Sequence, residues 1–269
     1  SHTWETTDYK RIFDIDFFIE PDFCSFHVLR TAITLYNLLP LWFNVIPIDL
    51  KVESPREYMA EARKHTLSPS AWNRFETCPR MYWLSRQRLP RKAGMAASVG
   101  TAVHASVEDL LQIDLSGRKP DETHWLPEIA ESFLKVRWEE EKKVFLSTPR
   151  RPMWKEKEWT KAKKMQRGAI KMLLEFVGAP GVTPLKTTVS LWKSLLSRVI
   201  AVEGELRTSD DRLMGRLDML FADVSDDGSL NGWIVADLKT GRAPENELKA
   251  EVQRQLLLYR DILLSNNPN

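Results

Sequence analysis

The amino-acid sequence predicts an α/β (α+β) protein with a mixed central sheet flanked by helices. After residue 67 the chain reads as several helical segments, then three strand-like runs, then one more helix. The strand-like runs cover 198–208, 212–224 and 232–241, and the polar turns between them favour an antiparallel meander. Apolar residues recur at helical spacing in 245–265, which predicts the final helix.

The composition is that of an ordinary globular protein. The chain has 269 residues, of which 43% are hydrophobic and 28% charged, so the disordered and fibrous classes are excluded. Its two cysteines, Cys24 and Cys78, argue against a disulfide scaffold and favour a reducing compartment. Two thiols are also too few for an all-cysteine zinc or iron–sulfur site within this chain.

No membrane segment is expected. The most apolar stretch, 29–50, is interrupted by an arginine, two asparagines and two prolines. It therefore lacks the run of about 18 apolar residues that a spanning helix needs. The N-terminus is polar and acidic, unlike a secretory signal. We expect an intracellular, cytoplasmic protein.

Residues 1–64 are interpreted as an N-terminal accessory segment. Apolar and polar residues alternate in 9–21, which predicts a strand that ends at Pro21. Ser54 and Pro55 predict the start of a helix over 54–66. The segment carries no catalytic pattern, so we expect it to pack against the rest of the chain or to dock a helicase or a second subunit.

The next segment, 67–86, predicts two short helices. Ser68 is a candidate N-cap with Pro69 in the first turn, and aromatic and apolar residues recur at roughly helical spacing. The pair Cys78-Pro79 interrupts this pattern, because proline breaks the turn that precedes it.

A further helix is predicted over 101–111. His104 and Glu108 lie four residues apart on it and therefore share one face. The residues that follow, 121–178, are also predicted to be helical, and they are rich in tryptophan.

The positive charge is concentrated in one stretch. Residues 135–171 contain thirteen Lys or Arg against five Glu, a net charge of +8, which leaves the rest of the chain at −6. Basic residues with interleaved tryptophans are expected for phosphate contact and base stacking. The alternative is a solvated helix with pairs of Glu and Lys one turn apart.

An aspartate and a lysine stand at the end of the last strand-like run. Alternation places Asp237 and Lys239 on the same face of that strand. Buried charges are costly unless they are paired or hold a metal, so packing alone does not explain this pair. The residues predict a functional site.

Four motifs now stand in order along the chain: Gly100-Thr101-Ala102-Val103-His104, Gly215-Arg216-Leu217-Asp218, Asp237-Leu238-Lys239-Thr240-Gly241 and Gln255 to Tyr259. Their order and spacing resemble those of the PD-(D/E)xK nuclease superfamily and, within it, the RecB-like exonuclease branch. The resemblance covers about 67–262 and leaves the first 60 or so residues outside it. It implies a restriction-endonuclease-like core within a nuclease domain over 65–269, in which 121–197 is a helical basic insertion.

The resemblance implies a site for Mg²⁺ or Mn²⁺. Asp218 and Asp237 would supply carboxylate ligands, the Leu238 carbonyl a backbone oxygen and His104 a further ligand. Magnesium prefers such oxygen ligands, and a hard cation offsets charge and activates water in phosphodiester hydrolysis. Lys239 would orient the attacking water or stabilise negative charge, with a role as general base left open.

The remaining site residues are expected to support these groups. Gln255 and Tyr259 lie one turn apart, and the family uses the glutamine to support the site and the DNA backbone, whereas simple packing is the alternative for Tyr259. Either Glu203 or Glu205 could hydrogen-bond the lysine or a metal-bound water, depending on strand register. Glu108 is expected beside His104.

The predicted partner is DNA, as a single strand or at duplex ends, so we expect the protein to be associated with the nucleoid. Candidate DNA contacts are Arg242, Lys161, Lys163, Lys164 and Arg167. Several relatives carry an iron–sulfur cluster on the Cys-Pro cysteine and three later cysteines. Only Cys78 has a counterpart here, so no cluster is expected in this chain. The resemblance implies a metal-dependent deoxyribonuclease of repair, recombination or anti-phage defence. An RNA-directed nuclease and a catalytically silent DNA-binding subunit remain alternatives.

Overall fold

The computed structural model describes residues 15–20, 24–32, 66–87, 89, 92–225, 228–240 and 249–266. Its main sheet has five strands in the order β1-β2-β7-β6-β3. The strands are β1 (Ile15–Glu20), β2 (Cys24–Ala32), β7 (Leu230–Thr240), β6 (Met219–Val224) and β3 (Val199–Val202). Every neighbouring pair in this sheet is antiparallel, so the described strands form an antiparallel rather than a mixed sheet. The α/β class itself is confirmed.

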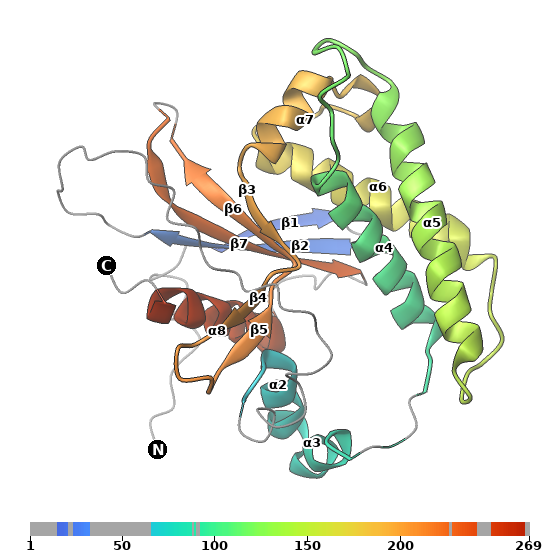
Figure 1. The fold of residues 1–269 in the computed structure, drawn as a ribbon, viewed down its shortest axis with the longest axis vertical. Coiled ribbons are helices and arrows are strands. Elements are labelled where there is room, and N and C mark those ends of the chain that lie inside the picture. The colour runs from blue at the N-terminus through green and yellow to red at the C-terminus, as the bar shows by residue number, and fades with distance from the viewer. Residues whose placement is uncertain are drawn as a thin grey trace.

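Two strands of the sheet come from the N-terminal segment. β2 pairs with β7 from Cys24 opposite Thr240 to Ala32 opposite Gly232, and β1 pairs with β2. The strand predicted before Pro21 corresponds to β1. The helix predicted over 54–66 lies outside the described residues, apart from Thr66, which is not helical. The central sheet thus draws on both ends of the chain, as Figure 1 shows.

Helices cover both faces of the sheet (Figure 1). On one face lie α4 (Met95–Leu111), α5 (Trp125–Ser147), α6 (Glu158–Phe176) and α7 (Val189–Leu196), preceded by the 3-10 turn η2 (Pro184–Lys186). On the other lies α8 (Ala250–Asn266). In β7, Ile234, Ala236 and Leu238 pack in the apolar core that includes residues of α4–α7. Val235 packs in the separate core under α8. Alternation therefore turns Asp237 towards α8.

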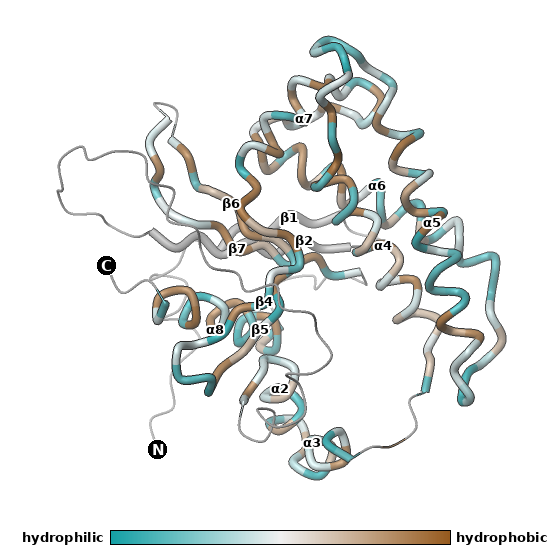
Figure 2. The backbone as a smooth tube through the Cα atoms, in the orientation of Figure 1, coloured by the Kyte–Doolittle hydropathy of each residue, from teal (hydrophilic) through white to brown (hydrophobic). Residues whose placement is uncertain are grey.

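The segment 121–197 is part of the main core. Trp125 and Trp192 are buried within it and contact each other edge to face at 6.2 Å. Both pack in the same apolar cluster as Phe221 of β6 and Ile234 of β7. Figure 2 shows the apolar residues of these helices gathered where the helices meet the sheet. Burial of this area contributes most of the local stability, because apolar surface removed from water is the main favourable contribution.

Two further helices, α2 (Pro69–Thr77) and α3 (Pro79–Ser85), lie at the opposite end of the molecule from α7 (Figure 1). Ser68 is the N-cap of α2 and accepts a hydrogen bond from the backbone N–H of Ala71 at 3.2 Å. Cys78 separates the two helices in an extended conformation. The predicted cap and the predicted interruption are both confirmed.

Two of the predicted strand runs are broken in their middle. The run 198–208 divides into β3 and β4 (Glu205–Arg207), and 212–224 divides into β5 (Met214–Arg216) and β6. β4 and β5 pair with each other in a separate two-stranded sheet. The break in the run 198–208 falls at Glu203, whose φ of 52° is left-handed. Such a conformation cannot continue a strand, so the ribbon turns where the candidate acids lie.

Candidate functional site

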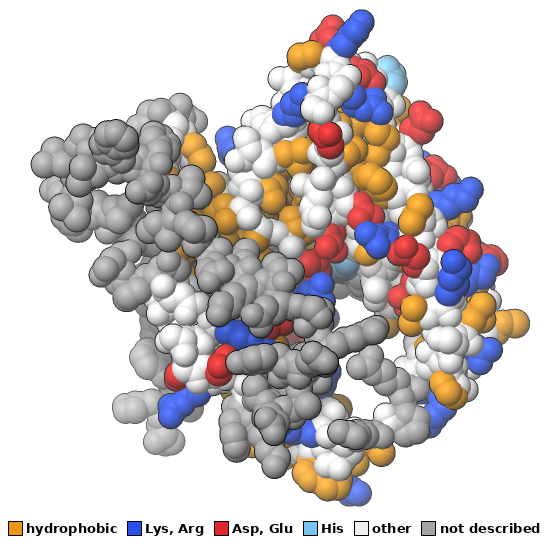
Figure 3. All heavy atoms as spheres, viewed as in Figure 1, with side chains coloured by type: hydrophobic (Ala, Val, Ile, Leu, Met, Phe, Trp, Pro, Cys, Tyr) orange, Lys and Arg blue, Asp and Glu red, His pale blue; other side chains and the backbone are white. Residues whose placement is uncertain are grey.

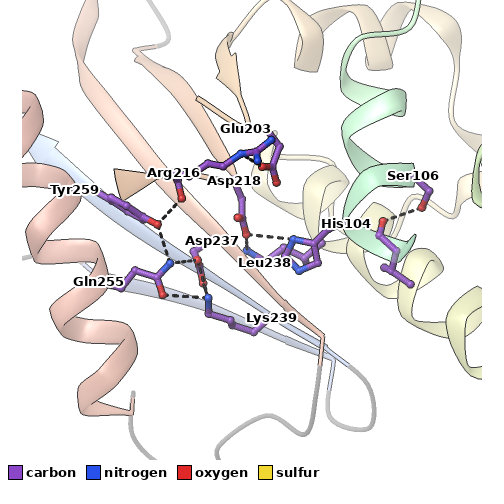
Figure 4. A network of polar contacts seen from close by, with 11 residues as sticks. His104, Ser106, Glu203, Arg216, Asp218, Asp237, Leu238, Lys239, Gln255 and Tyr259 are labelled. Carbon is purple, nitrogen blue, oxygen red and sulfur yellow. Dashed lines mark hydrogen bonds and ion pairs between the residues drawn. The ribbon is translucent and has the colours of Figure 1, made fainter. Parts of the chain in front are cut away.

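Asp218 and Asp237 lie on neighbouring strands of the main sheet. Asp218 directly precedes β6, and Asp237 lies within β7, where Ala236 pairs with Met219. The backbone N–H of Leu238 donates to Asp218 Oδ2 at 2.8 Å, which fixes that carboxylate beside the second strand. Figure 4 shows both acids turned towards one centre between α4 and α8.

Asp237 holds a lysine and a glutamine. Lys239 Nζ donates to Asp237 Oδ1 at 2.8 Å and to Gln255 Oε1 at 3.1 Å, and Gln255 Nε2 donates to the same Asp237 oxygen at 2.9 Å. The predicted face shared by Asp237 and Lys239 is therefore present. Gln255 projects from α8 towards Asp237 of β7. The lysine ammonium has a fixed position at the site.

Tyr259 continues this network by one helical turn. Its hydroxyl accepts from Gln255 Nε2 at 2.9 Å and donates to the backbone carbonyl of Arg216. Its ring lies against Gly215, where a Cβ atom would come within 2.3 Å of Tyr259 Cε1. The glycine of the Gly-x-x-Asp motif is thus required by the close approach of the tyrosine. Tyr259 is both a packed residue and a member of the polar network.

His104 reaches the site from the opposite side, on α4. Its Nδ1 lies 3.5 Å from Asp218 Oδ2, and the ring hydrogen-bonds to the backbone of Leu238. A Cβ atom at Gly100, one turn earlier on α4, would lie 2.6 Å from Thr240 Oγ1. The glycine of the Gly-x-x-x-His motif therefore lets α4 approach the end of β7 closely. The four sequence motifs meet at one place.

Glu203 lies beside His104 and Asp218. One ligand atom from each of these three residues lies within 4.8 Å of the others. Glu108, one turn after His104, lines the same small pocket. Glu205 instead accepts from Arg207 Nε at 2.7 Å, and its side chain is half exposed. Of the two acids left open by strand register, the structure brings Glu203 to the site and leaves Glu205 outside it.

Arg216 was not predicted as a site residue. Its guanidinium forms an ion pair with Glu203, and its carbonyl accepts from Tyr259. A usable signal was present, because Arg216 lies two residues before Asp218 and alternation would direct both side chains to one face. The ion pair offsets the negative charge of Glu203, which would otherwise repel the Asp218 carboxylate.

Burial shapes the ionisation of the site. Burial raises the pKa of Asp218 to about 6, and burial with the neighbouring Asp218 carboxylate raises the pKa of Asp237 to about 6. Burial also lowers the pKa of His104, which keeps its ring neutral and able to act as a ligand. The pKa of Glu108 is raised, first by burial and then by Glu203. The protein alone therefore disfavours the anionic forms that the site gathers.

A divalent cation fits this donor set. Asp237 is fully buried, and its Oδ2 makes no hydrogen bond with the described residues, although it lies 2.8 Å from Lys239 Nζ. A buried carboxylate oxygen without a hydrogen bond is costly unless a cation takes it. His104, Glu203 and Asp218 add one imidazole and two carboxylates within reach of one another. Carboxylate and carbonyl oxygens are the ligands that Mg²⁺ and Mn²⁺ prefer.

The predicted DNA contacts lie on α6 or outside the described residues. Arg242 and Gly241 fall in the undescribed range 241–248. Lys161, Lys164 and Arg167 are exposed on α6, whereas Lys163 forms an ion pair with Glu131 at 3.2 Å.

The prediction that the tryptophans of 135–171 stack on bases is wrong for the central one. Trp138 is 2% exposed and contacts Trp154 and Trp159 edge to face, at 4.8 Å and 5.4 Å. Trp154 also packs against buried Phe145 at 5.1 Å. These rings form a core between α4, α5 and α6. They stand among lysines in the sequence, but their side chains turn towards the interior.

Two strands that each carry an acid, with a lysine beside one of them, form a site suited to metal-assisted phosphodiester cleavage. A family model described as PD-(D/E)XK nuclease superfamily matches residues 66–269, and the chain belongs to this superfamily. No curated protein and no solved structure gave a match. Membership indicates a nuclease, an enzyme of the phosphodiesterase type that uses divalent metal. Among the helices in the described ranges, none has the length and apolarity to cross a bilayer.

Proposed function

We propose that this protein is a Mg²⁺- or Mn²⁺-dependent deoxyribonuclease of the RecB-like branch, acting on single strands or DNA ends. The convergence of His104, Asp218, Asp237 and Lys239 at one point carries the proposal. It is supported by Asp237 Oδ2, a buried oxygen that makes no hydrogen bond and is ion-paired with Lys239 Nζ at 2.8 Å, so that it has capacity for a divalent cation. The acid–acid–lysine set is intact, which favours an enzyme over a silent subunit.

Asp218, Asp237 and His104, with the Leu238 carbonyl, would hold the cation, and Glu203 would complete or support this set. A bound divalent cation supplies Lewis acidity at the phosphoryl oxygens and lowers the pKa of a water molecule. The residues themselves bind and orient. Glu108 lines the pocket behind His104 without reaching the three-residue group.

Lys239 would act on the attacking water or on the negative charge that develops at phosphorus. Its Nζ lies within 3.1 Å of three acceptor oxygens, Asp237 Oδ1, Asp237 Oδ2 and Gln255 Oε1, which hold the ammonium at the site. Gln255 holds the lysine from α8, and Tyr259 holds Gln255. This chain of contacts would fix the ammonium before substrate binds, which is the condition for electrostatic stabilisation without reorganisation.

The biological setting proposed is DNA repair, recombination or anti-phage defence, with the protein at the nucleoid. The exposed cations Lys161, Lys164 and Arg167 on α6 would contact phosphates, and Arg242 is proposed as a further phosphate contact. A helicase or second subunit could dock through the N-terminal segment. No observation gives a specific reason to prefer RNA.

The test is incubation of the full chain with end-labelled single- and double-stranded DNA, with Mg²⁺, with Mn²⁺ and with chelator, beside matched RNA strands. We expect metal-dependent release of labelled products from DNA. The double variant Asp237→Ala/Lys239→Ala serves as the control, and calorimetry reports its loss of divalent-metal binding. Undiminished cleavage by that variant would falsify the proposal. Cleavage of RNA but not DNA would overturn the substrate assignment and keep the site.

A further inference from the structure

The helical unit α2–α3 carries an exposed surface that the catalytic site does not use. α3 has no buried residue, although Met81, Trp83 and Leu84 on it are large and apolar. Trp83 is 60% exposed, and Phe75 of α2 is 49% exposed. A short helix that buries nothing gains little from packing, so its apolar side chains contribute little to the fold.

This unit is also basic, and it contains fewer acids than 135–171. Residues 66–94 contain six Lys or Arg and a single acid, Glu76, a net charge of +5 in 29 residues. Arg74, Arg80 and Lys92 form no ion pair with any residue in the described ranges. In 135–171, by contrast, several cations are already paired with acids: Arg137 with Asp109 and Glu140, Lys142 with Glu156, and Lys163 with Glu131.

The cations and rings alternate along one side of α3. Arg80, Trp83 and Arg86 follow one another at three-residue spacing, which places them on neighbouring positions of the helix surface. Arg86 donates to the Tyr82 hydroxyl at 3.2 Å and lies over the Tyr82 ring, and that ring contacts Phe75 edge to face at 5.8 Å. Trp83 makes no such ring contact within the described residues and is largely exposed.

The unit is anchored to the catalytic helix. Asn73 of α2 donates to the Glu251 carbonyl at 3.1 Å and accepts from Arg254 Nε at 2.8 Å, and Arg254 directly precedes Gln255. The chain after α3 leads to α4, which carries His104, and Ala93 donates to the Arg150 carbonyl at 3.0 Å on the way. The unit is thus attached to α8 on the glutamine side of the site. Figure 3 shows the molecule hollowed between this unit and the helices on the α5 side.

We propose that α2–α3 binds an unpaired nucleic-acid strand, with bases stacked on Trp83 and Phe75 and phosphates on Arg74, Arg80 and Lys92. The inference rests on the proposed nuclease function and names the form of its substrate. A polyanion complements the charge, and an open indole face suits a base that is not already stacked in a duplex. A protein partner is disfavoured, because a docking surface with one acid and several cations would need a partner that is acidic throughout.

The test measures binding apart from cleavage. Full-length protein in chelator is titrated into labelled oligothymidylate and into a hairpin duplex with closed ends, and anisotropy gives both affinities. Trp83→Ala should weaken single-strand binding by roughly tenfold and leave hairpin binding unchanged. Trp83→Phe, which keeps an aromatic ring, should retain most of the wild-type affinity. Leu185→Ala, at a similarly exposed apolar residue of η2 far from α3, is the matched control and should change neither. Arg80→Gln should reduce the slope of log affinity against log salt by about 0.7.

Unchanged single-strand binding in Trp83→Ala, or an equal loss on the hairpin, would overturn the inference. Hydrolysis of bis(4-nitrophenyl) phosphate with Mn²⁺ is measured in parallel, because so small a substrate does not reach α3. If that activity is present and Trp83→Ala binds normally, the stacking surface is wrong and the nuclease proposal stands. If the wild type cleaves nothing, and Trp83→Ala binds the single strand more weakly than the wild type does, the binding surface stands and the nuclease proposal fails.

Discussion

The ring of Tyr259 lies against Gly215, so closely that a Cβ atom there would fall 2.3 Å from Cε1 of the ring. This contact joins α8 to the strand that leads into Asp218. We predict that Gly215→Ala displaces the tyrosine and, through it, Gln255. The cost in unfolding free energy should be about 1–3 kcal/mol, as for overpacking. Denaturant unfolding measures it, and Gly117→Ala, at a position with no heavy atom within 4 Å of the added Cβ, is the control.

Gln255 is predicted to position Lys239 rather than to bind metal. Gln255→Leu removes the acceptor of Lys239 Nζ and the donors to Asp237 and Tyr259. We expect kcat to fall by roughly a hundredfold, because a small misplacement of a catalytic group has effects of that size. Divalent-metal affinity measured by calorimetry should change little. A loss of metal binding as large as that of Asp237→Ala would show that Gln255 acts on the ligands instead.

The metal-free protein should lose stability as pH rises through the range in which its buried acids ionise. Asp218 and Asp237 have folded pKa values of about 6 against 3.8 for the ordinary group, so the folded state prefers their protonated forms. The penalty is absent below about pH 4, grows between about pH 4 and pH 6, and is complete above. Thermal unfolding in chelator measures it, and Asp237→Asn should show a weaker pH dependence and a higher Tm than wild type above about pH 6.

The same groups make metal binding depend on pH in the opposite direction. Protons compete with the cation for the two carboxylates, so affinity for Mg²⁺ should fall as pH drops below about 6. Added metal should therefore raise the Tm most in the range where the metal-free protein is weakest. Calorimetry in buffers of different ionisation enthalpy would detect proton release on binding. An affinity that does not change across this range would contradict the buried-acid description.

Trp138 is predicted to matter for stability and not for DNA. Trp138→Ala should cost about 3–5 kcal/mol of unfolding free energy, because it empties a ring site in a closed core. Trp83→Ala should cost less than about 0.5 kcal/mol, as for an exposed position. Urea titrations of the two variants side by side distinguish a core tryptophan from a surface one. Equal costs would mean that α3 is packed more tightly than its exposure indicates.

Much of the candidate site could be predicted because its residues are unusual where they stand. A charged pair at the end of an apolar strand, Asp237 and Lys239, has no packing explanation. His104 could be predicted as a site residue because of the Gly-x-x-x-His motif in which it lies. The glycines of the motifs carried less information alone. Only the structure shows that Gly100 is needed by Thr240 and Gly215 by Tyr259. These are contacts between segments that local sequence does not relate.

What could not be predicted depends on which way a residue faces. The tryptophans near the lysines of 135–171 looked suited to stacking, and Trp138 is instead buried, because helical spacing alone does not say which side meets the core. The break in the strand runs at Glu203 needs a left-handed φ that a glutamate rarely adopts. The pairing of β2 with β7 joins residues 200 or more positions apart, for which no local signal exists.

That pairing has a consequence for any shortened form of the chain. β2 covers one side of β7 along the full length from Thr240 to Gly232. A polypeptide that begins at residue 66 would keep every motif yet leave the N–H and C=O groups on that side of its catalytic strand without partners. Exposed strands of this kind recruit other strands, so such a protein should self-associate through β7. The first part of the chain, which carries none of the motifs, thus protects the strand that carries the most important one.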